Sequence, residues 1–75
     1  MIEITLLAPC YFDESIGYWT GEPDGAALAR ALAAVPEDPA VTRAVSVGGV
    51  VLRGPEAAAS AMALDLEEAG LERIG

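Results

Sequence analysis

One short stretch, CYFDESIGYW at residues 10–19, brings together the groups in this chain of 75 residues that could do chemistry. It contains the only cysteine, every aromatic ring and two adjacent acids. A thiol, phenols and paired carboxylates are groups that can serve as a nucleophile, as an acid and base, or as ligands of a metal ion. The first question is therefore whether the rest of the chain supplies the partners that such chemistry needs.

The composition removes most of these reactions. The sequence contains no histidine, lysine, asparagine or glutamine. Ser-His-Asp and Cys-His catalysis need an imidazole, and Schiff bases and P-loops need a lysine. A single cysteine without histidine also excludes thiolate or imidazole sites for zinc or copper within one chain. We therefore predict that the protein is not an enzyme, and that it has no catalytic residue, cofactor or metal site.

The acids near the rings fit this prediction. Asp13 and Glu14, with Glu22 and Asp24, could in principle hold Ca²⁺ or Mg²⁺, or act as an acid and base pair. Their spacing does not follow the D-x-D-x-D-G pattern of an EF-hand. We expect solvated acidic turns, and we expect Cys10 to be an inert packing residue.

The four rings have two interpretations. Tyr11, Phe12, Tyr18 and Trp19 could form a small core, because the alanine-rich helices supply little bulk. They could also form a contact surface, because tryptophan and tyrosine are enriched at binding hot spots. We predict both in part, with residues 10–20 forming a loop or small hairpin and Trp19 as the main contact.

Periodicity and turn residues predict the elements around this segment. Alternation predicts strands, a repeat of three and four predicts helices, and Gly48-Gly49 between valine-rich runs predicts a type I′ or II′ hairpin turn. The expected elements are a strand at 2–8, a helix at 24–35, a hairpin at 41–53, a helix at 54–70 and a short strand at 71–74.

The helical spacing also predicts which side chains are buried. The expected stripes are Leu28, Ala31, Leu32 and Val35 on the first helix, and Ala58, Met62, Leu66 and Ala69 on the second. Leu64 falls on the other side of the second helix, so we expect it to be an exposed apolar residue and include it among the partner-binding candidates.

This order of elements predicts a single α+β domain over residues 1–75. It is the split βαβ pattern (β-α-β-β-α-β) of ferredoxin-like sandwiches, with a long aromatic loop or hairpin between the first strand and the first helix. Both helices would cover one face of the sheet. The other face would carry Glu3, Thr5, Leu7, Thr42, Ala44 and Ser46, which suits packing against another protein.

The charge limits the partners. Twelve acids against four arginines give a net charge of −8, which repels nucleic acid and anionic lipid and favours basic protein surfaces. The simpler interpretation of the same charge is that it keeps a small domain soluble. The N-terminus does not read as a signal peptide, and no segment has the length of a membrane span. With a lone thiol, these features predict a cytoplasmic protein that binds neither nucleic acid nor membrane.

We therefore predict a non-enzymatic module for protein–protein contact. It would be a homo-oligomer, or a small accessory subunit of a larger complex, including a phage-encoded one. The partner-binding residues would be Tyr11, Phe12, Tyr18, Trp19 and Leu64. Two alternatives stay open: a small-ligand-binding domain that uses residues 11–19, and an acidic mimic that inhibits a basic nucleic-acid-binding protein.

Overall fold

The structure of the chain is a computed structural model that describes residues 1–13, 15 and 17–74, without the side chains of residues 11–13 and 18–20. It contains six strands and two helices within these residues. In chain order they are β1 (Ile2–Leu7), β2 (Cys10–Asp13), β3 (Tyr18–Pro23), α1 (Gly25–Ala34), β4 (Thr42–Val45), β5 (Gly49–Gly54), α2 (Glu56–Glu68) and β6 (Glu72–Ile74).

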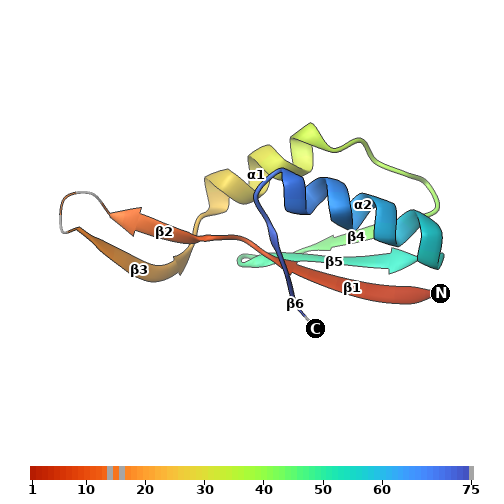
Figure 1. The fold of residues 1–75 in the computed structure, drawn as a ribbon, viewed down its shortest axis with the longest axis horizontal. Coiled ribbons are helices and arrows are strands. Elements are labelled where there is room, and N and C mark those ends of the chain that lie inside the picture. The colour runs from red at the N-terminus through yellow and green to blue at the C-terminus, as the bar shows by residue number, and fades with distance from the viewer. Residues whose placement is uncertain (14, 16, 75) are drawn as a thin grey trace.

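Four of the strands form one antiparallel sheet in the order β4-β5-β1-β6. Both helices lie on the same side of this sheet, and the other side is bare (Figure 1). The chain is thus a small α+β protein with two helices and a four-stranded antiparallel sheet, as the sequence predicted at this level.

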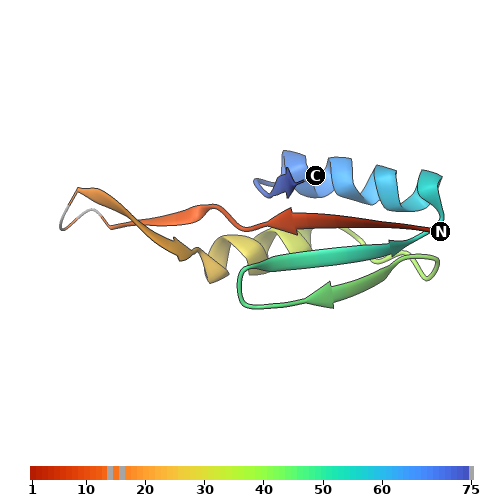
Figure 2. The same cartoon turned by 90° about the horizontal axis from the view of Figure 1, so that it is seen from below.

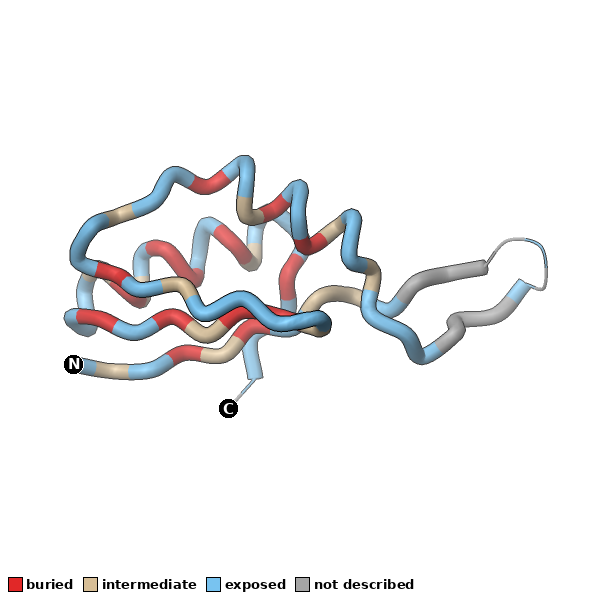
Figure 3. Tube along the Cα trace, turned by 180° about the vertical axis from the view of Figure 1, so that it is seen from behind, coloured by how far each residue is buried: buried red, intermediate tan, exposed pale blue. Residues whose placement is uncertain are grey.

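The core lies between the sheet and the helices. Ile4 and Leu6 of β1 pair directly with Leu52 and Val50 of β5, so all four side chains point to the same face, where they are buried. The red segments in Figure 3 mark this buried layer and the helical residues that complete it. Those helical residues are Leu28, Ala31, Ala59, Met62, Ala63 and Leu66.

The predicted stripe is right for α1 and partly wrong for α2. In α1, Leu28, Ala31 and the C-cap Val35 are buried, and Leu32 is half-buried. In α2 the buried side is turned toward Ala59 and Ala63, while Ala58 is half-buried and Ala69 is exposed. Alanines occupy both sides of α2, so apolar character alone did not show which of them face the core.

The β4–β5 hairpin is confirmed, but its predicted turn is wrong. The Ser46 N–H donates to Gly49 O at 2.9 Å, so Val47 and Gly48 form the loop. A type I′ or II′ turn needs a positive φ at its first central residue, and neither Val47 nor Gly48 has one. Gly49 instead begins β5, where an added Cβ would collide with Leu6 O of β1.

The segment between β1 and α1 forms a second, two-stranded sheet. β2 and β3 pair antiparallel, with Phe12 opposite Trp19 and Asp13 opposite Tyr18. This pair extends beyond the end of the four-stranded sheet (Figure 2). The Asp24 N–H donates to Pro9 O at 2.8 Å, which joins the entrance and the exit of the segment.

Candidate interaction surfaces

The bare face of the sheet is the broadest candidate surface. Ala44, Val51, Thr5 and Ile74 are directly opposite one another on the four strands, so they form one row across the whole sheet. None of the four side chains is charged. Ala44 and Ile74 are exposed, and Val51 and Thr5 are half-buried. We call these four residues the sheet row.

Beside the sheet row, Glu3 and Arg53 form a balanced pair on one side, and Glu72 of β6, opposite Leu7, adds an acid on the other side. Arg53 Nη2 lies 2.6 Å from Glu3 Oε2, and the two residues are direct partners across β5 and β1. Both side chains are exposed, so this ion pair contributes at most about 1 kcal/mol to stability. Because the two charges are opposite, the part of the bare face next to Thr5 and Val51 on this side carries no net charge.

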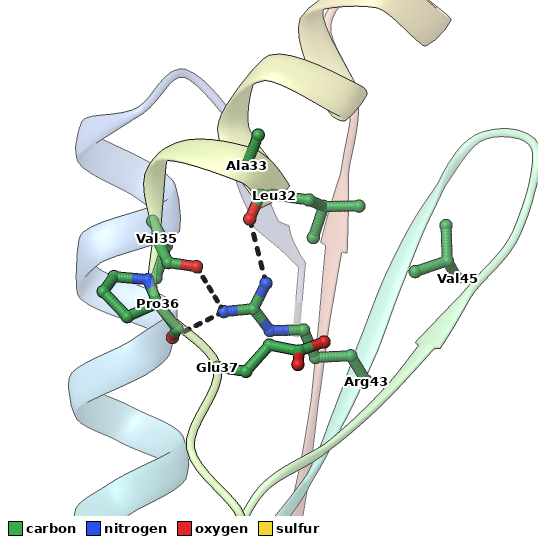
Figure 4. A pocket seen from close by; sticks show the side chains of 7 residues that line it. All are labelled: Leu32, Ala33, Val35, Pro36, Glu37, Arg43 and Val45. Carbon is green, nitrogen blue, oxygen red and sulfur yellow. Dashed lines mark hydrogen bonds between the residues drawn. The ribbon is translucent and has the colours of Figure 1, made fainter.

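Arg43 lies on the opposite face and is part of the fold. Its Nη1 donates to Leu32 O at 3.0 Å, and its Nη2 donates to Val35 O and Pro36 O, both at 2.7 Å (Figure 4). Its Nε donates to Met62 Sδ at 3.3 Å. The last carbonyls of a helix have no partner within the helix, and a cation there also opposes the helix dipole. The side chain of Arg43 in β4 therefore caps and stabilises the carboxyl end of α1.

The hollow around Arg43 does not have the chemistry of an anion site. It has a volume of about 460 Å³ and is lined by Leu32, Ala33, Val35, Pro36, Glu37, Arg43 and Val45. A guanidinium has five N–H groups, and four of those of Arg43 are used in the bonds above. The rim of the hollow is apolar and includes Val45, which is 58% exposed.

The predicted partner-binding residues have different outcomes. The side chains of Tyr11, Phe12, Tyr18 and Trp19 lie outside the described residues, and only their backbone is placed, in β2 and β3. Their roles therefore stay predictions. Leu64 is 56% exposed on α2, as expected of an isolated apolar residue on the outer side of that helix.

The predictions for the loop acids and for the cysteine also have different outcomes. Asp24 caps α1, because its Oδ1 accepts the Ala27 N–H at 3.1 Å. Glu14 and the side chain of Asp13 lie outside the described residues. Cys10 is exposed, so the expected packing role of its side chain is wrong.

Two kinds of site are absent from the part of the chain that the structure describes. In residues 1–13, 15 and 17–74, no three acid, cysteine or histidine side chains come together as they would around a metal ion. Over the same part of the chain, no helix has the length and apolar character needed to cross a bilayer.

Sequence reasoning missed three of the residues that shape these surfaces. Val51 and Ile74 were not assigned to the bare face, although alternation from the buried Val50 and Leu52 places Val51 there. Arg43 was not singled out at all. The available signal was an arginine at a position that alternates with Val41 and Val45, but the partners of this arginine lie on a different element.

Comparison of the chain with protein-family models, with curated proteins and with solved structures gives no match in any of the three.

Proposed function

We propose that this protein is a non-enzymatic protein–protein interaction module. It acts as a homo-oligomer or as a small accessory subunit of a larger, including phage-encoded, complex. The observation that carries the proposal is the sheet row, an uncharged strip across all four strands on a face that no helix covers.

The composition supports the same conclusion. A protein with a net charge of −8 is kept apart from its neighbours by charge, so an uncharged strip on its surface is the place where another protein can approach at the lowest electrostatic cost. Small side chains such as Ala44 and Thr5 also allow a flat surface to come close. The absence of histidine and lysine from the sequence supports a role in binding over a role in catalysis.

The proposal includes a ferredoxin-like arrangement of the strands and further contact residues outside the sheet row. The strand order β4-β5-β1-β6 is compatible with the split βαβ arrangement of ferredoxin-like folds, and we propose that arrangement here. Tyr11, Phe12, Tyr18, Trp19 and Leu64 are proposed as further partner contacts. The pair β2–β3 supports the proposal for the rings, because a two-stranded sheet alone is marginally stable in water and gains from a partner.

The test is the mass of the protein in solution, with one substitution on the sheet row. Light scattering of the wild-type chain should give a mass above the monomer's 7.7 kDa, or a complex of fixed stoichiometry with an identified protein. Val51→Arg places a charge in the middle of the row and should weaken the contact made by this face by roughly tenfold or more.

The control is Ala57→Arg, which changes the net charge equally at an exposed position of α2. It should leave the assembly unchanged. A wild-type chain that remains a monomer up to about 1 mM and binds no protein would contradict the proposed function.

A further inference from the structure

We propose that the free edge of β4 pairs with the same edge of a second copy of this chain. The two strands would run antiparallel about a two-fold axis at Ala44 and would join the two four-stranded sheets into one. This inference rests on the proposed function, because it assumes that the chain assembles, and it names the partner and the contact.

The backbone of β4 presents the groups that such pairing needs. In an antiparallel pair, successive residues point their N–H and C=O groups alternately to one neighbour and to the other side. The bond from Ser46 N–H to Gly49 O sets the phase of this alternation. Thr42 and Ala44 therefore point their backbone groups to β5, and Arg43 and Val45 point theirs to the free edge.

The other edge of the sheet is not equivalent. β6 has three residues, two of which are the charged Glu72 and Arg73, and short charged edge strands are a known protection against pairing. β4 has no acid, and Val45 and the adjacent Val47 are 58% and 86% exposed. Of the two edges, β4, with four residues and one charge, is the less protected.

A second copy would meet the least acidic part of the chain at this edge. Residues 39–55 contain two arginines and no acid, so this segment has a charge of +2, while the remaining residues hold all twelve acids and two arginines, a charge of −10. Two copies with a net charge of −8 each repel one another over most of their surfaces. Contact through β4 brings together the one segment of this length that is free of acids.

The residues of β4 suit a two-fold pairing centred on Ala44. Ala44 would face its own copy in a non-hydrogen-bonded pair, where side chains lie closest, and alanine is small enough for that position. Arg43 and Val45 would pair with Val45 and Arg43 of the second copy and exchange four backbone hydrogen bonds. The exposed methyl groups of Val45 would then lie against the aliphatic part of Arg43 in the second copy.

The first test removes one backbone donor without disturbing the monomer. Val45→Pro deletes an N–H that points to the free edge, and proline is tolerated on edge strands for that reason. It should weaken dimerisation, measured by sedimentation equilibrium, by roughly tenfold or more, because each dimer loses two hydrogen bonds. Circular dichroism should show an unchanged fold.

The matched control is Val45→Ala, which shortens the side chain but keeps the N–H. It should weaken the dimer much less than Val45→Pro does. Equal dissociation constants for the two folded variants would overturn the pairing of backbone edges.

The second test uses charge at the two-fold axis. Ala44→Arg and Ala44→Glu should each lose the dimer, because like charges would face each other, and an equimolar mixture of the two should recover it as a heterodimer. Ala57→Arg, at an exposed position of α2 outside the proposed contacts, should have no effect.

The outcomes separate the two proposals. A dimer that survives both Val45→Pro and Ala44→Arg, or that is lost in Ala57→Arg alone, would overturn the β4 contact and leave the proposed function standing. A chain that stays monomeric up to about 1 mM and binds no other protein would overturn both.

Discussion

The two helices end in different ways, although both lie on the same side of the sheet. The carbonyls at the end of α1 are bonded by the side chain of Arg43, which belongs to the strand after the next loop. The carbonyls at the end of α2 are bonded by the backbone of the residues that follow at once: Gly70 N–H donates to Glu67 O at 3.1 Å, and Leu71 N–H donates to Leu66 O at 3.0 Å.

The end of α2 is a Schellman motif, in which Gly70 has a φ of +114° and Leu71 returns to the core beside Leu66. All its parts lie within six residues. The end of α1 has no such turn, because Val35 is extended and Pro36 follows it. One helix thus has a local stop and the other needs a distant side chain, so the stability of α1 should depend on the formation of β4, whereas that of α2 should not.

The largest effect in this comparison is expected at Arg43. Arg43→Met should lower the free energy of unfolding by about 2 kcal/mol, because three carbonyls lose a charged donor and water reaches only part of the site. Urea unfolding would measure the loss. Hydrogen exchange should rise in the last turn of α1 and not in α2.

Two controls accompany this change. Arg43→Lys keeps the charge near the helix end but not the fork of donors, so it should recover only part of the loss. Arg73→Met removes an equal charge from exposed β6 and should cost little. Equal stabilities of Arg43→Met and the wild type would contradict the role of Arg43 at the end of α1.

A smaller effect is expected at the local stop of α2. Gly70→Ala should lower the free energy of unfolding by about 1–2 kcal/mol, because an alanine is strained at positive φ even though open space surrounds the position. The matched control is Gly25→Ala in the first turn of α1. Gly25 lacks a positive φ and has open space around it, so this change should be neutral or slightly stabilising by thermal unfolding.

The smallest effect is expected at the start of α1. Asp24→Ala removes the acceptor of the Ala27 N–H and should cost about 1 kcal/mol in urea unfolding. Asp24→Asn or Asp24→Ser keeps a capping oxygen and should recover most of the loss. If Asp24→Ser were as unstable as Asp24→Ala, the effect would have to come from a source other than the cap.

Local rules predicted much of the fold. Pro36 and Gly70 marked the ends of the helices, alternation gave the buried face of β1, and the two valine-rich runs gave the β4–β5 hairpin. The same rules failed where several residues satisfied them equally. The alanines of α2 allow a buried stripe at more than one rotation of the helix. Gly48-Gly49 has the composition of a turn, but Gly49 belongs to β5 and lies close to Leu6 of β1.

The candidate surfaces were less predictable than the fold. The bare face was expected from the order of the elements, and Thr5 and Ala44 were assigned to it correctly. The continuity of the sheet row was not, because it depends on the register between strands that are distant in the sequence. The rings of residues 11–19, on which the sequence prediction concentrated, remain a prediction.

The sequence by itself determined the charge, the absence of histidine and lysine, the local end of α2 and the alternation of the strands. Each of these depends on residue types or on neighbours within a few positions. The tertiary structure decided which edge of the sheet is open, which residues share a row, and that Arg43 holds the end of α1. These depend on contacts between segments far apart in the chain, which the spacing of residues along the sequence does not specify.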